Sequence, residues 1–537
     1  MKPPLRAFLI ILLTSLILLF FSIFIEPLNL FFFKENSFRL CFSDIPALLG
    51  FKPSAEYSEK HDTTGSLSED SLIKILSGTY KHAWPDDSVK IHALVLSYVK
   101  NNLSEDTLQN IQKIEAFVNN NIKSDSSVAA KFIKNLLLSY FNASDDKAIL
   151  NPLIGSSRPL DAFFYALLKE ADTSLIRVAH YGDSQLEGGR LSVNIRKKFQ
   201  QKFGGNGVGF VPFIETVSNV ALSHFDMDGW QRYTVFHDRY CNSFYGASGN
   251  VYRWSPCAKN NGDSLSSDTL KEEKYALGLN FSPWAKWEKV SLMYGRSMGD
   301  CYVSVFDEKN NLVTSDTLYP APSFALQDID IPATVKKMRF EFSSNVVFDF
   351  YGFLFDGKKG VQVDNYGIRG HSGDGLLHIS RKYFAEQLQQ LKTKLIILQF
   401  GANAVPYVNN ENECKEIEEN FFRILQRCKE VAPDASILLI GTGDMATRLK
   451  GEWQSFPILP KFREAQKNAA IRAGCAYWNL GTVMGGENAI LEWTKQKFAS
   501  NDGHFTPNGQ EEVATRLFDA LMLEYEKYCN EKNSARK

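Results

Sequence analysis

The stretch that decides the fold is "LIRVAHYGDSQLEGGR", residues Leu175 to Arg190. Its mostly apolar first half predicts a strand that ends at Gly182, and a predicted helix follows over Leu186–Phe203. Between them the chain presents a lone serine, Ser184, on a turn that glycine supports. A serine placed there would stand clear of the sheet, with its backbone N–H near the start of the helix.

The same alternation of apolar strands and amphipathic helices continues to the end of the chain. Further strands are predicted at Gly360–Ile368, Lys394–Gly401, Ala435–Gly443 and Cys475–Gly481, and further helices at Asp374–Leu391, Glu411–Val431, Pro460–Ala473 and Pro507–Lys527. This pattern predicts a parallel sheet that is covered by helices on both faces. Ligands of such folds bind at the carboxyl ends of the strands, where Ser184 lies.

One segment, from about Pro212 to Phe355, interrupts this alternation. It contains many short alternating strands and no convincing helix, which predicts an inserted β-sandwich or jelly roll. Its aromatic residues would form either a platform for sugar rings or part of the core; these include Trp230, Trp254, Trp284 and Trp287.

The amino terminus predicts a membrane anchor. Lys2 and Arg6 precede Ala7–Ile25, an uncharged apolar run of the length that crosses a bilayer as a helix. No small-residue cleavage site follows, so a retained signal anchor is favoured over a cleaved signal peptide. The positive-inside rule then places the remaining chain outside the cytoplasm, in the periplasm or at the cell surface.

Composition excludes several classes of protein. The 537 residues carry a net charge of -1, which gives no electrostatic reason to expect a nucleic-acid partner. Zinc-finger, zincin and phosphate-loop patterns are absent. The eight cysteines are scattered, and free thiols are favoured, although Cys241 and Cys257 would be able to form a local disulfide outside the cytoplasm.

Four residues in chain order carry the chemistry. Ser184 is the candidate nucleophile, and Gly370 and Asn403, which follow the next two strands of the α/β region, offer hydrogen-bond donors to an oxyanion. His504 precedes the last predicted helix and is the candidate base. The carboxyl ends of the strands and the final loop should therefore converge on one rim.

These four blocks resemble those of the SGNH (GDSL) esterases and acetyltransferases: a GDS serine, a glycine, a GxN asparagine and a DxxH histidine. The inserted β module and "FGGNGVGF" (Phe203 to Phe210) look like the peptidoglycan O-acetylesterase branch. Two positions depart from the pattern. Ala404 replaces an acid, and Asn501 stands three residues before the histidine, where the family has aspartate. Asp502, two residues before it, is favoured over Asn501 as the residue that orients His504.

The resemblance implies a flavodoxin-like α/β/α sandwich. The expected organisation is an anchor (1–30), a linker (31–70), a helical segment (71–158), an SGNH domain in two pieces (159–211 and 356–537) and the β module (212–355). Neither the serine nor the base lies in the module, so we expect it to recognise polymer without taking part in acyl chemistry.

The implied function is a membrane-anchored serine esterase that removes O-acetyl groups from a cell-wall or exported polysaccharide without a metal or cofactor. Two alternatives remain open. One is an O-acetyltransferase that receives acetyl groups from a membrane acyltransferase and passes them to a sugar hydroxyl. The other is a catalytically weak glycan-binding protein.

Overall fold

The structure, a computed structural model, describes residues 153–155, 158–215, 217–255, 273–500 and 502–534. All of them belong to the second of two compact units, Val89–Lys537, which is described here by itself. The predicted anchor, the linker and nearly all of the helical segment lie outside the described residues. Within the described residues, no helix has the length and apolar character needed to cross a membrane.

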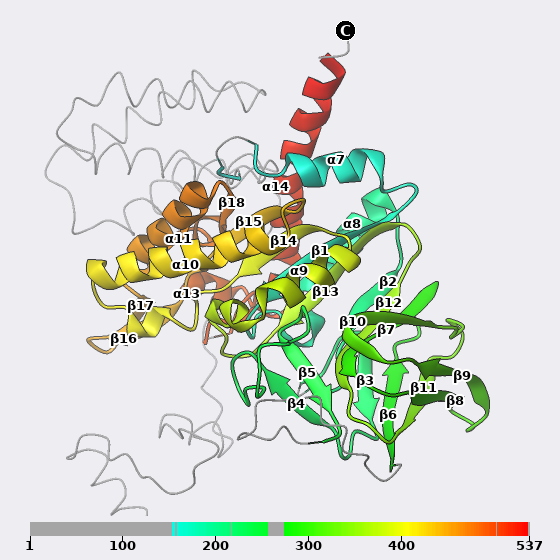
Figure 1. Cartoon of the computed structure of the whole chain (residues 1–537). Coiled ribbons are helices and arrows are strands. Elements are labelled where there is room, and N and C mark those ends of the chain that lie inside the picture. Colours follow the sequence, from blue (N-terminus) through cyan, green and yellow to red (C-terminus); the bar gives the residue numbers. More distant parts are fainter. Residues whose placement is uncertain (1–152, 156–157, 216, 256–272, 501, 535–537) are drawn as a thin grey trace, which may run out of the picture. The chain divides into compact units, whose positions relative to one another are not determined.

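A five-stranded parallel sheet forms the centre of this unit (Figure 1). Its strands, in spatial order, are β13 (Gly360–Gly367), β1 (Leu175–Gly182), β14 (Thr393–Gln399), β15 (Ser436–Gly441) and β18 (Ala476–Asn479). Gly182 is level with Gly367 on one side and with Gln399 on the other. The loops that follow β1, β13 and β14 therefore leave the sheet at the same edge.

Helices cover both faces of the sheet because its strands are apolar on both sides. One apolar core joins one face to α9 (Arg381–Gln390), α10 (Glu411–Val431) and α11 (Leu459–Ala473). A second core joins the other face to α7 (Asp161–Lys169), α8 (Arg190–Phe203), α12 (Leu480–Met484), α13 (Ala489–Lys495) and α14 (Pro507–Ser534). The central region is thus a three-layer α/β/α sandwich.

The helix after Ser184 begins later than the sequence predicts. Residues Glu187–Gly189 form a short 3-10 turn (η2), and α8 begins at Arg190. Gly188 and Gly189 have φ values of 75° and 80°, which favour glycine and break the helix. A side chain on Gly188 would also meet the backbone oxygen of Ser218 at 2.5 Å. Ser184 therefore lies on a separate turn, not at the N-terminus of α8.

Smaller elements complete the α/β region. Two short 3-10 turns, η3 (Asp374–His378) and η4 (Val405–Tyr407), follow β13 and β14. A hairpin of β16 (Ala446–Leu449) and β17 (Glu452–Ser455) follows β15. The sequence pattern did not predict this hairpin.

Two antiparallel sheets form the inserted β module. One contains β10 (Ala321–Ile329), β7 (Lys289–Ser297), β12 (Asp349–Asp356), β5 (Asn250–Arg253), β4 (Gln231–Thr234) and β2 (Gly207–Val211). The other contains β3 (Leu222–Phe225), β6 (Glu273–Phe281), β11 (Lys337–Ser344), β8 (Cys301–Asp307) and β9 (Leu312–Leu318).

The tryptophans of the module mostly serve its core. Trp230, Trp254 and Trp287 are buried between aromatic rings, and only Trp284 of the four is exposed, at 50%. A shared sugar-stacking platform made from these four residues is therefore excluded. Core packing explains three of them.

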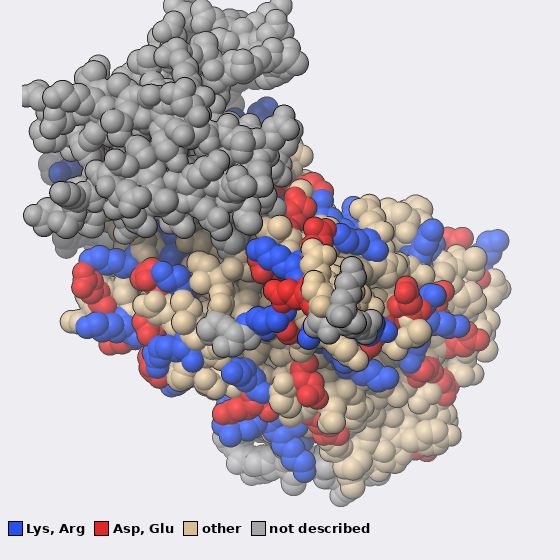
Figure 2. All heavy atoms as spheres, turned by 90° about the horizontal axis from the view of Figure 1, so that it is seen from above, with Lys and Arg blue, Asp and Glu red and all other residues tan. Residues whose placement is uncertain are grey.

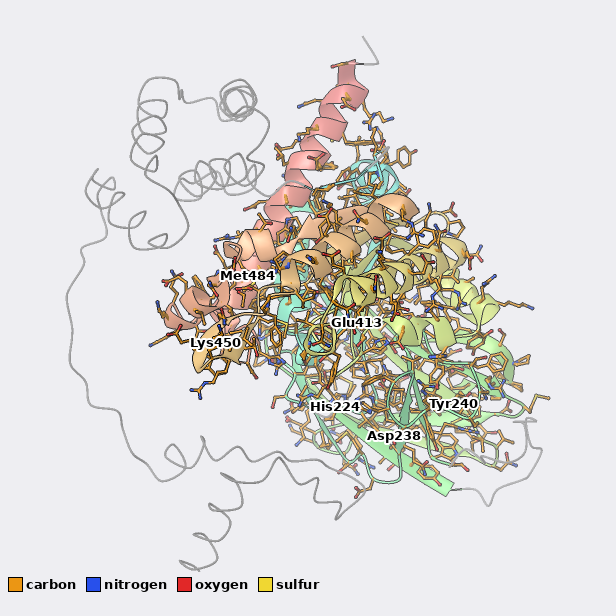
Figure 3. All side chains as sticks on the ribbon, turned by 90° about the vertical axis from the view of Figure 1, so that its left-hand side faces the viewer. His224, Asp238, Tyr240, Glu413, Lys450 and Met484 are labelled. Atoms are coloured by element: carbon orange, nitrogen blue, oxygen red, sulfur yellow. The ribbon has the colours of Figure 1, made fainter. Side chains whose placement is uncertain are left out.

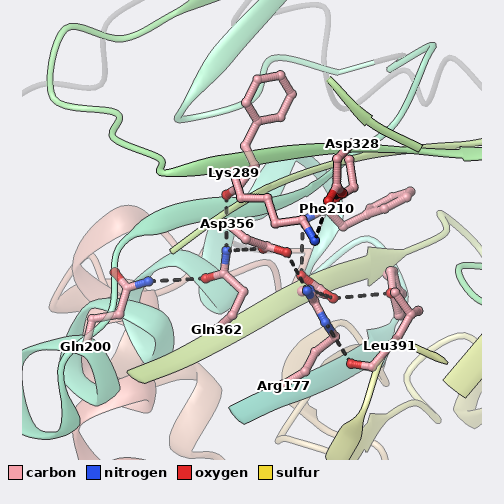
Figure 4. Close-up of polar contacts among 12 residues, drawn as sticks. Arg177, Gln200, Phe210, Lys289, Asp328, Asp356, Gln362 and Leu391 are labelled. Carbon is pink, nitrogen blue, oxygen red and sulfur yellow. Dashed lines mark hydrogen bonds and ion pairs between the residues drawn. The ribbon is translucent and has the colours of Figure 1, made fainter. Parts of the chain in front are cut away.

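A buried ionic network joins the module to the parallel sheet (Figure 4). Arg177 of β1 donates to Asp364 of β13 at 2.7 Å and to Asp356, the last residue of β12, at 2.5 Å. Asp364 also accepts a hydrogen bond from the Phe210 amide of β2 at 3.0 Å. Because each ion has its partners, the junction fixes the module to the sheet without an unpaired buried charge.

On the face that Figure 2 shows, charges of both signs are mixed. Figure 2 shows Lys and Arg interspersed with Asp and Glu over the visible face. Cys241 is disulfide-bonded, so the expectation of free thiols is wrong for this residue. Cys257 lies outside the described residues. Free thiols are found at Cys301, Cys414, Cys428, Cys475 and Cys529.

Candidate active site

Ser184 and His504 meet at the carboxyl edge of the sheet. The Ser184 hydroxyl lies 2.8 Å from Nε2 of His504, which is within hydrogen-bonding distance. The serine comes from the turn after β1, and the histidine comes from the loop before α14. This is the contact that a base needs in order to take the proton of a serine nucleophile.

Asp502 holds the other nitrogen of the imidazole. Its Oδ2 lies 2.9 Å from His504 Nδ1, while its Oδ1 accepts the His504 amide at 3.1 Å and the Ser500 hydroxyl. Asp502 precedes His504 by only two residues. Its carboxylate still reaches the imidazole because it folds back on the loop, as in an Asx turn. With a proton on Nδ1, Nε2 is the acceptor that faces Ser184.

The environment of Asp502 keeps it ionised. Partial burial acts to raise its pKa, but hydrogen bonds from Ser500 and His504 and the charge of His504 together hold the pKa below its usual value. The structure thus assembles a carboxylate–imidazole–hydroxyl chain from Asp502, His504 and Ser184. Asn501 lies outside the described residues.

Asn403 lies in the loop after β14, and Asp183 orients it. Its side-chain nitrogen donates to Asp183 Oδ2 at 3.1 Å and to the His371 carbonyl at 3.3 Å. Asp183 is buried, and burial raises its pKa to about 6, although the Gln185 amide and the charge of His504 act in the opposite direction. Both N–H groups of Asn403 are therefore engaged, the one toward His371 more weakly.

Gly370 is in the loop after β13 with a φ of 75°, a conformation that a glycine adopts without strain. Among the described residues, neither the Gly370 amide nor the Ser184 amide has a hydrogen-bond partner. Two backbone donors in adjacent strand-end loops thus remain available. Such donors are what a developing oxyanion requires.

Gln185, which the sequence analysis did not single out, ties the two catalytic loops together. Its side-chain nitrogen donates to the Gly503 carbonyl at 2.8 Å, and its oxygen accepts the Phe505 amide at 3.1 Å. These bonds flank His504 on both sides. The only sequence signal was an amide side chain directly after the serine.

Arg190 and Glu187 support the turn that carries the serine. Arg190 donates to the Ser184 carbonyl at 3.0 Å and so holds the turn. Glu187 is buried and pairs with the exposed Arg369 at 2.8 Å. Arg190 thus braces the backbone of the serine turn, and the Glu187–Arg369 pair links that turn to the loop after β13.

The histidines near the other blocks have structural contacts. His180 is fully buried between Gln399 and Ser192, and burial lowers its pKa to about 3. His371 accepts the Gly375 amide at 3.0 Å, and burial lowers its pKa to about 4. Both are therefore neutral near pH 7, and neither contacts Ser184.

A small pocket lies beside the triad. Its lining includes Asp183, Gln185, Gly503 and Phe505, together with residues that follow β14 and β15. No group of His, Cys, Asp and Glu side chains that would hold a metal ion is found among the described residues. The hydroxyl, imidazole and carboxylate of Ser184, His504 and Asp502, with the two backbone amides beside them, are an arrangement that can carry out acyl transfer.

Comparison with known proteins gives a family match for one part of the chain and a shared fold. Residues 345–512 match the model of the GDSL-like Lipase/Acylhydrolase family. A solved structure of a peptidoglycan O-acetylesterase is 19% identical, with a TM-score of 0.54, and the match covers 70% of this chain and 99% of that chain. This likeness shows a shared fold.

A second solved structure is that of an acetyl xylan esterase. It is 12% identical, with a TM-score of 0.24, and the match covers 30% of this chain and 81% of that chain. No curated protein matches the sequence significantly.

Proposed function

We propose that the chain, whose residues 345–512 match the model of the GDSL-like Lipase/Acylhydrolase family, is an SGNH hydrolase that removes O-acetyl groups from a carbohydrate polymer. The observation that carries the proposal is the chain of contacts from Asp502 through His504 to Ser184, at 2.9 and 2.8 Å. A hydroxyl placed on an imidazole that a carboxylate orients is an activated nucleophile.

The reaction follows from this geometry. His504 takes the proton of Ser184 as its Oγ attacks the ester carbonyl, and Asp502 stabilises the imidazolium that forms. His504 then gives the proton to the departing sugar hydroxyl, which leaves an acetyl group on Ser184. Water, deprotonated by His504, attacks the acyl carbonyl; the bond to Ser184 Oγ then breaks, His504 returns the proton to Oγ, and acetate is released.

The oxyanion is stabilised by three donors in this proposal. The amides of Ser184 and Gly370 have no partner among the described residues. The side chain of Asn403 would exchange its 3.3 Å bond to the His371 carbonyl for the oxyanion, while Asp183 keeps hold of its other N–H. Asp183 thus positions the amide, a role that fits its place beside Ser184 in the chain.

The solved structure that shares this fold supports a carbohydrate substrate. The peptidoglycan O-acetylesterase shares the fold over 99% of its length, and the match covers 70% of this chain, more than the α/β layers alone contain. Cell-wall glycans and exported polysaccharides are therefore the substrates to test first.

The catalytic unit is proposed to act outside the cytoplasm, anchored by Ala7–Ile25. Two observations support this location: the apolar run behind two cations, and the disulfide bond of Cys241, which persists in oxidising compartments. Membrane fractionation and protease protection of the full chain in intact cells would test it. Recovery of the chain as a soluble cytoplasmic protein would contradict the proposal.

The direct test of function is acetate release from a panel of O-acetylated glycans, with p-nitrophenyl acetate as a small reference ester. Wild-type protein is expected to release acetate from at least one glycan, and Ser184→Ala is expected to release none. A sugar acceptor in a parallel reaction separates hydrolysis from acetyl transfer. Binding of a glycan without cleavage of any ester would favour the glycan-binding alternative.

A further inference from the structure

A loop of the β module reaches the rim of the candidate site. It follows β4 and packs Phe236 against Gly370: a methyl group on Gly370 would lie 3.0 Å from Phe236 Cε1 and 3.6 Å from His237 Nε2. The Phe236 ring also lies 5.9 Å from the ring of His371, centroid to centroid. The module is therefore in contact with the segment that offers an oxyanion donor.

The loop holds His237 in a fixed place. The buried Thr234 hydroxyl accepts the His237 amide at 2.7 Å and the Phe236 amide at 3.2 Å, and it donates to the His237 carbonyl. The neighbouring Asp238 and the following Tyr240 are labelled in Figure 3. A backbone tied down by one side chain presents its next side chain in a defined position.

The imidazole of His237 is exposed, and the one ring that contacts it within the described part of the chain is that of Phe236, at 4.3 Å between centroids. Among the described residues, no hydrogen-bond partner for the imidazole is found. An exposed ring that both donates and accepts hydrogen bonds, fixed beside the oxyanion glycine, is suited to a hydroxyl or ring oxygen of a bound sugar.

We propose that His237 contacts the sugar unit that carries the ester, so that the β module supplies one wall of the active site. The inference rests on the proposed function, and it changes the role expected of the module. The module then contributes to the choice of the acetylated sugar at the reacting centre, not only to remote binding of polymer. Phe236 positions His237 and shields Gly370.

The experiment compares full-length wild type, His237→Ala and His237→Gln on two substrates: p-nitrophenyl acetate and the O-acetylated glycan that the wild type cleaves fastest. Loss of one sugar hydrogen bond should lower kcat/KM for the glycan about tenfold in His237→Ala. The small ester has no sugar, so its kcat/KM should change by less than about threefold. His237→Gln, which keeps a donor and an acceptor, should recover part of the glycan activity.

The matched control is Tyr302→Ala, an exposed aromatic residue (58%) on β8 in the other sheet of the module. It should leave both activities unchanged. An equal loss on both substrates in His237→Ala would mean that the loop only supports the fold of the site, and no loss on either would also overturn the inference. A wild type that cleaves neither substrate would contradict the proposed function itself.

Discussion

The two ends of strand β1 both carry paired acids and bases, but with opposite exposure. At the amino end, the side chains of Arg177 and Asp364 are 5% and 0% exposed. At the carboxyl end, the side chains of His504 and Asp502 are 37% and 67% exposed. Because it is buried, the ionic network around Arg177 permanently connects the β module to the parallel sheet; we call it the joint. Because they are exposed, His504 and Asp502 can exchange protons with a substrate.

The joint is sensitive to mutation because the charges of Arg177, Asp356 and Asp364 stabilise one another. Burial alone would lower the pKa of Arg177, but the charges of Asp356 and Asp364 raise it above its usual value. The arginine therefore stays charged, and the two carboxylates depend on it. The triad has no comparable redundancy, since a single hydrogen bond connects Asp502 to the His504 ring. Stability should therefore respond to the first region and activity to the second.

The largest expected effect comes from Arg177→Met, which leaves two carboxylates buried without their cation. The free energy of unfolding should fall by about 3–5 kcal/mol. Denaturant unfolding measures this, with Lys527→Met as the control, because the exposed Lys527–Glu524 pair should contribute less than about 1 kcal/mol. A loss in Arg177→Met no larger than in the control would contradict the structural role of the joint.

Asp502→Asn should have the opposite effect: a large loss of activity with little loss of stability. Turnover of p-nitrophenyl acetate should fall on the order of 10²-fold, about 2.7 kcal/mol in activation free energy. Stability should change by less than about 1 kcal/mol because the side chain is mostly exposed. Asn501→Ala is the control and should do much less. A nearly silent Asp502→Asn together with a severe Asn501→Ala would show that the wrong acid has been assigned.

Asp183 lies between the two cases, since it is buried yet belongs to the site. Its pKa is about 6 in the folded protein and about 3.9 in an unfolded chain, so the folded state holds the proton to higher pH. Folding stability due to this group is therefore lost as pH rises from about 4 to about 6. Asparagine does not titrate, so Asp183→Asn should gain on the order of 2 kcal/mol relative to wild type between pH 4.5 and 7.5. Denaturant unfolding at both pH values measures this gain. A pH-independent difference would refute the assignment of a raised pKa.

The smallest effect is expected from Gln185→Ala, which removes the two bonds that flank His504. A slightly misplaced base should lower kcat about tenfold, with little change in KM. Gln200→Ala is the matched control: this glutamine bonds Gln362 at the buried joint, at 3.2 Å, and kcat should not respond to it. Steady-state kinetics on p-nitrophenyl acetate gives kcat for both variants. Equal kcat values for the two variants would remove Gln185 from the site.

Much of the fold was predictable because the parallel strands are locally strong signals. The apolar run from Leu175 to Gly182 is the observed β1, and the helix predicted at Glu411–Val431 is observed with those bounds. Where local pattern and tertiary contact compete, prediction failed. Gly188 and Gly189 delay the start of the predicted helix to Arg190, because the β module packs against their backbone.

The site was predictable only where residues follow strands in order. Ser184 and His504 are brought together as their positions at strand and loop ends suggest. Phe236 and His237 gave no signal, because their approach to Gly370 depends on how the inserted module docks. The same docking forms the ionic joint at Arg177, whose partners lie 179 and 187 residues away in sequence. Contacts of that range have no local signature.

The central claim is that Ser184 is a nucleophile that His504 activates. The most direct measurement is covalent labelling of the full-length protein with a fluorophosphonate, a reagent for activated serines, followed by peptide mass spectrometry. Wild type should carry one adduct on Ser184, and His504→Ala should label at least 10²-fold more slowly, on the order expected for loss of the base. Labelling of a different residue, or equal labelling of both proteins, would contradict the account.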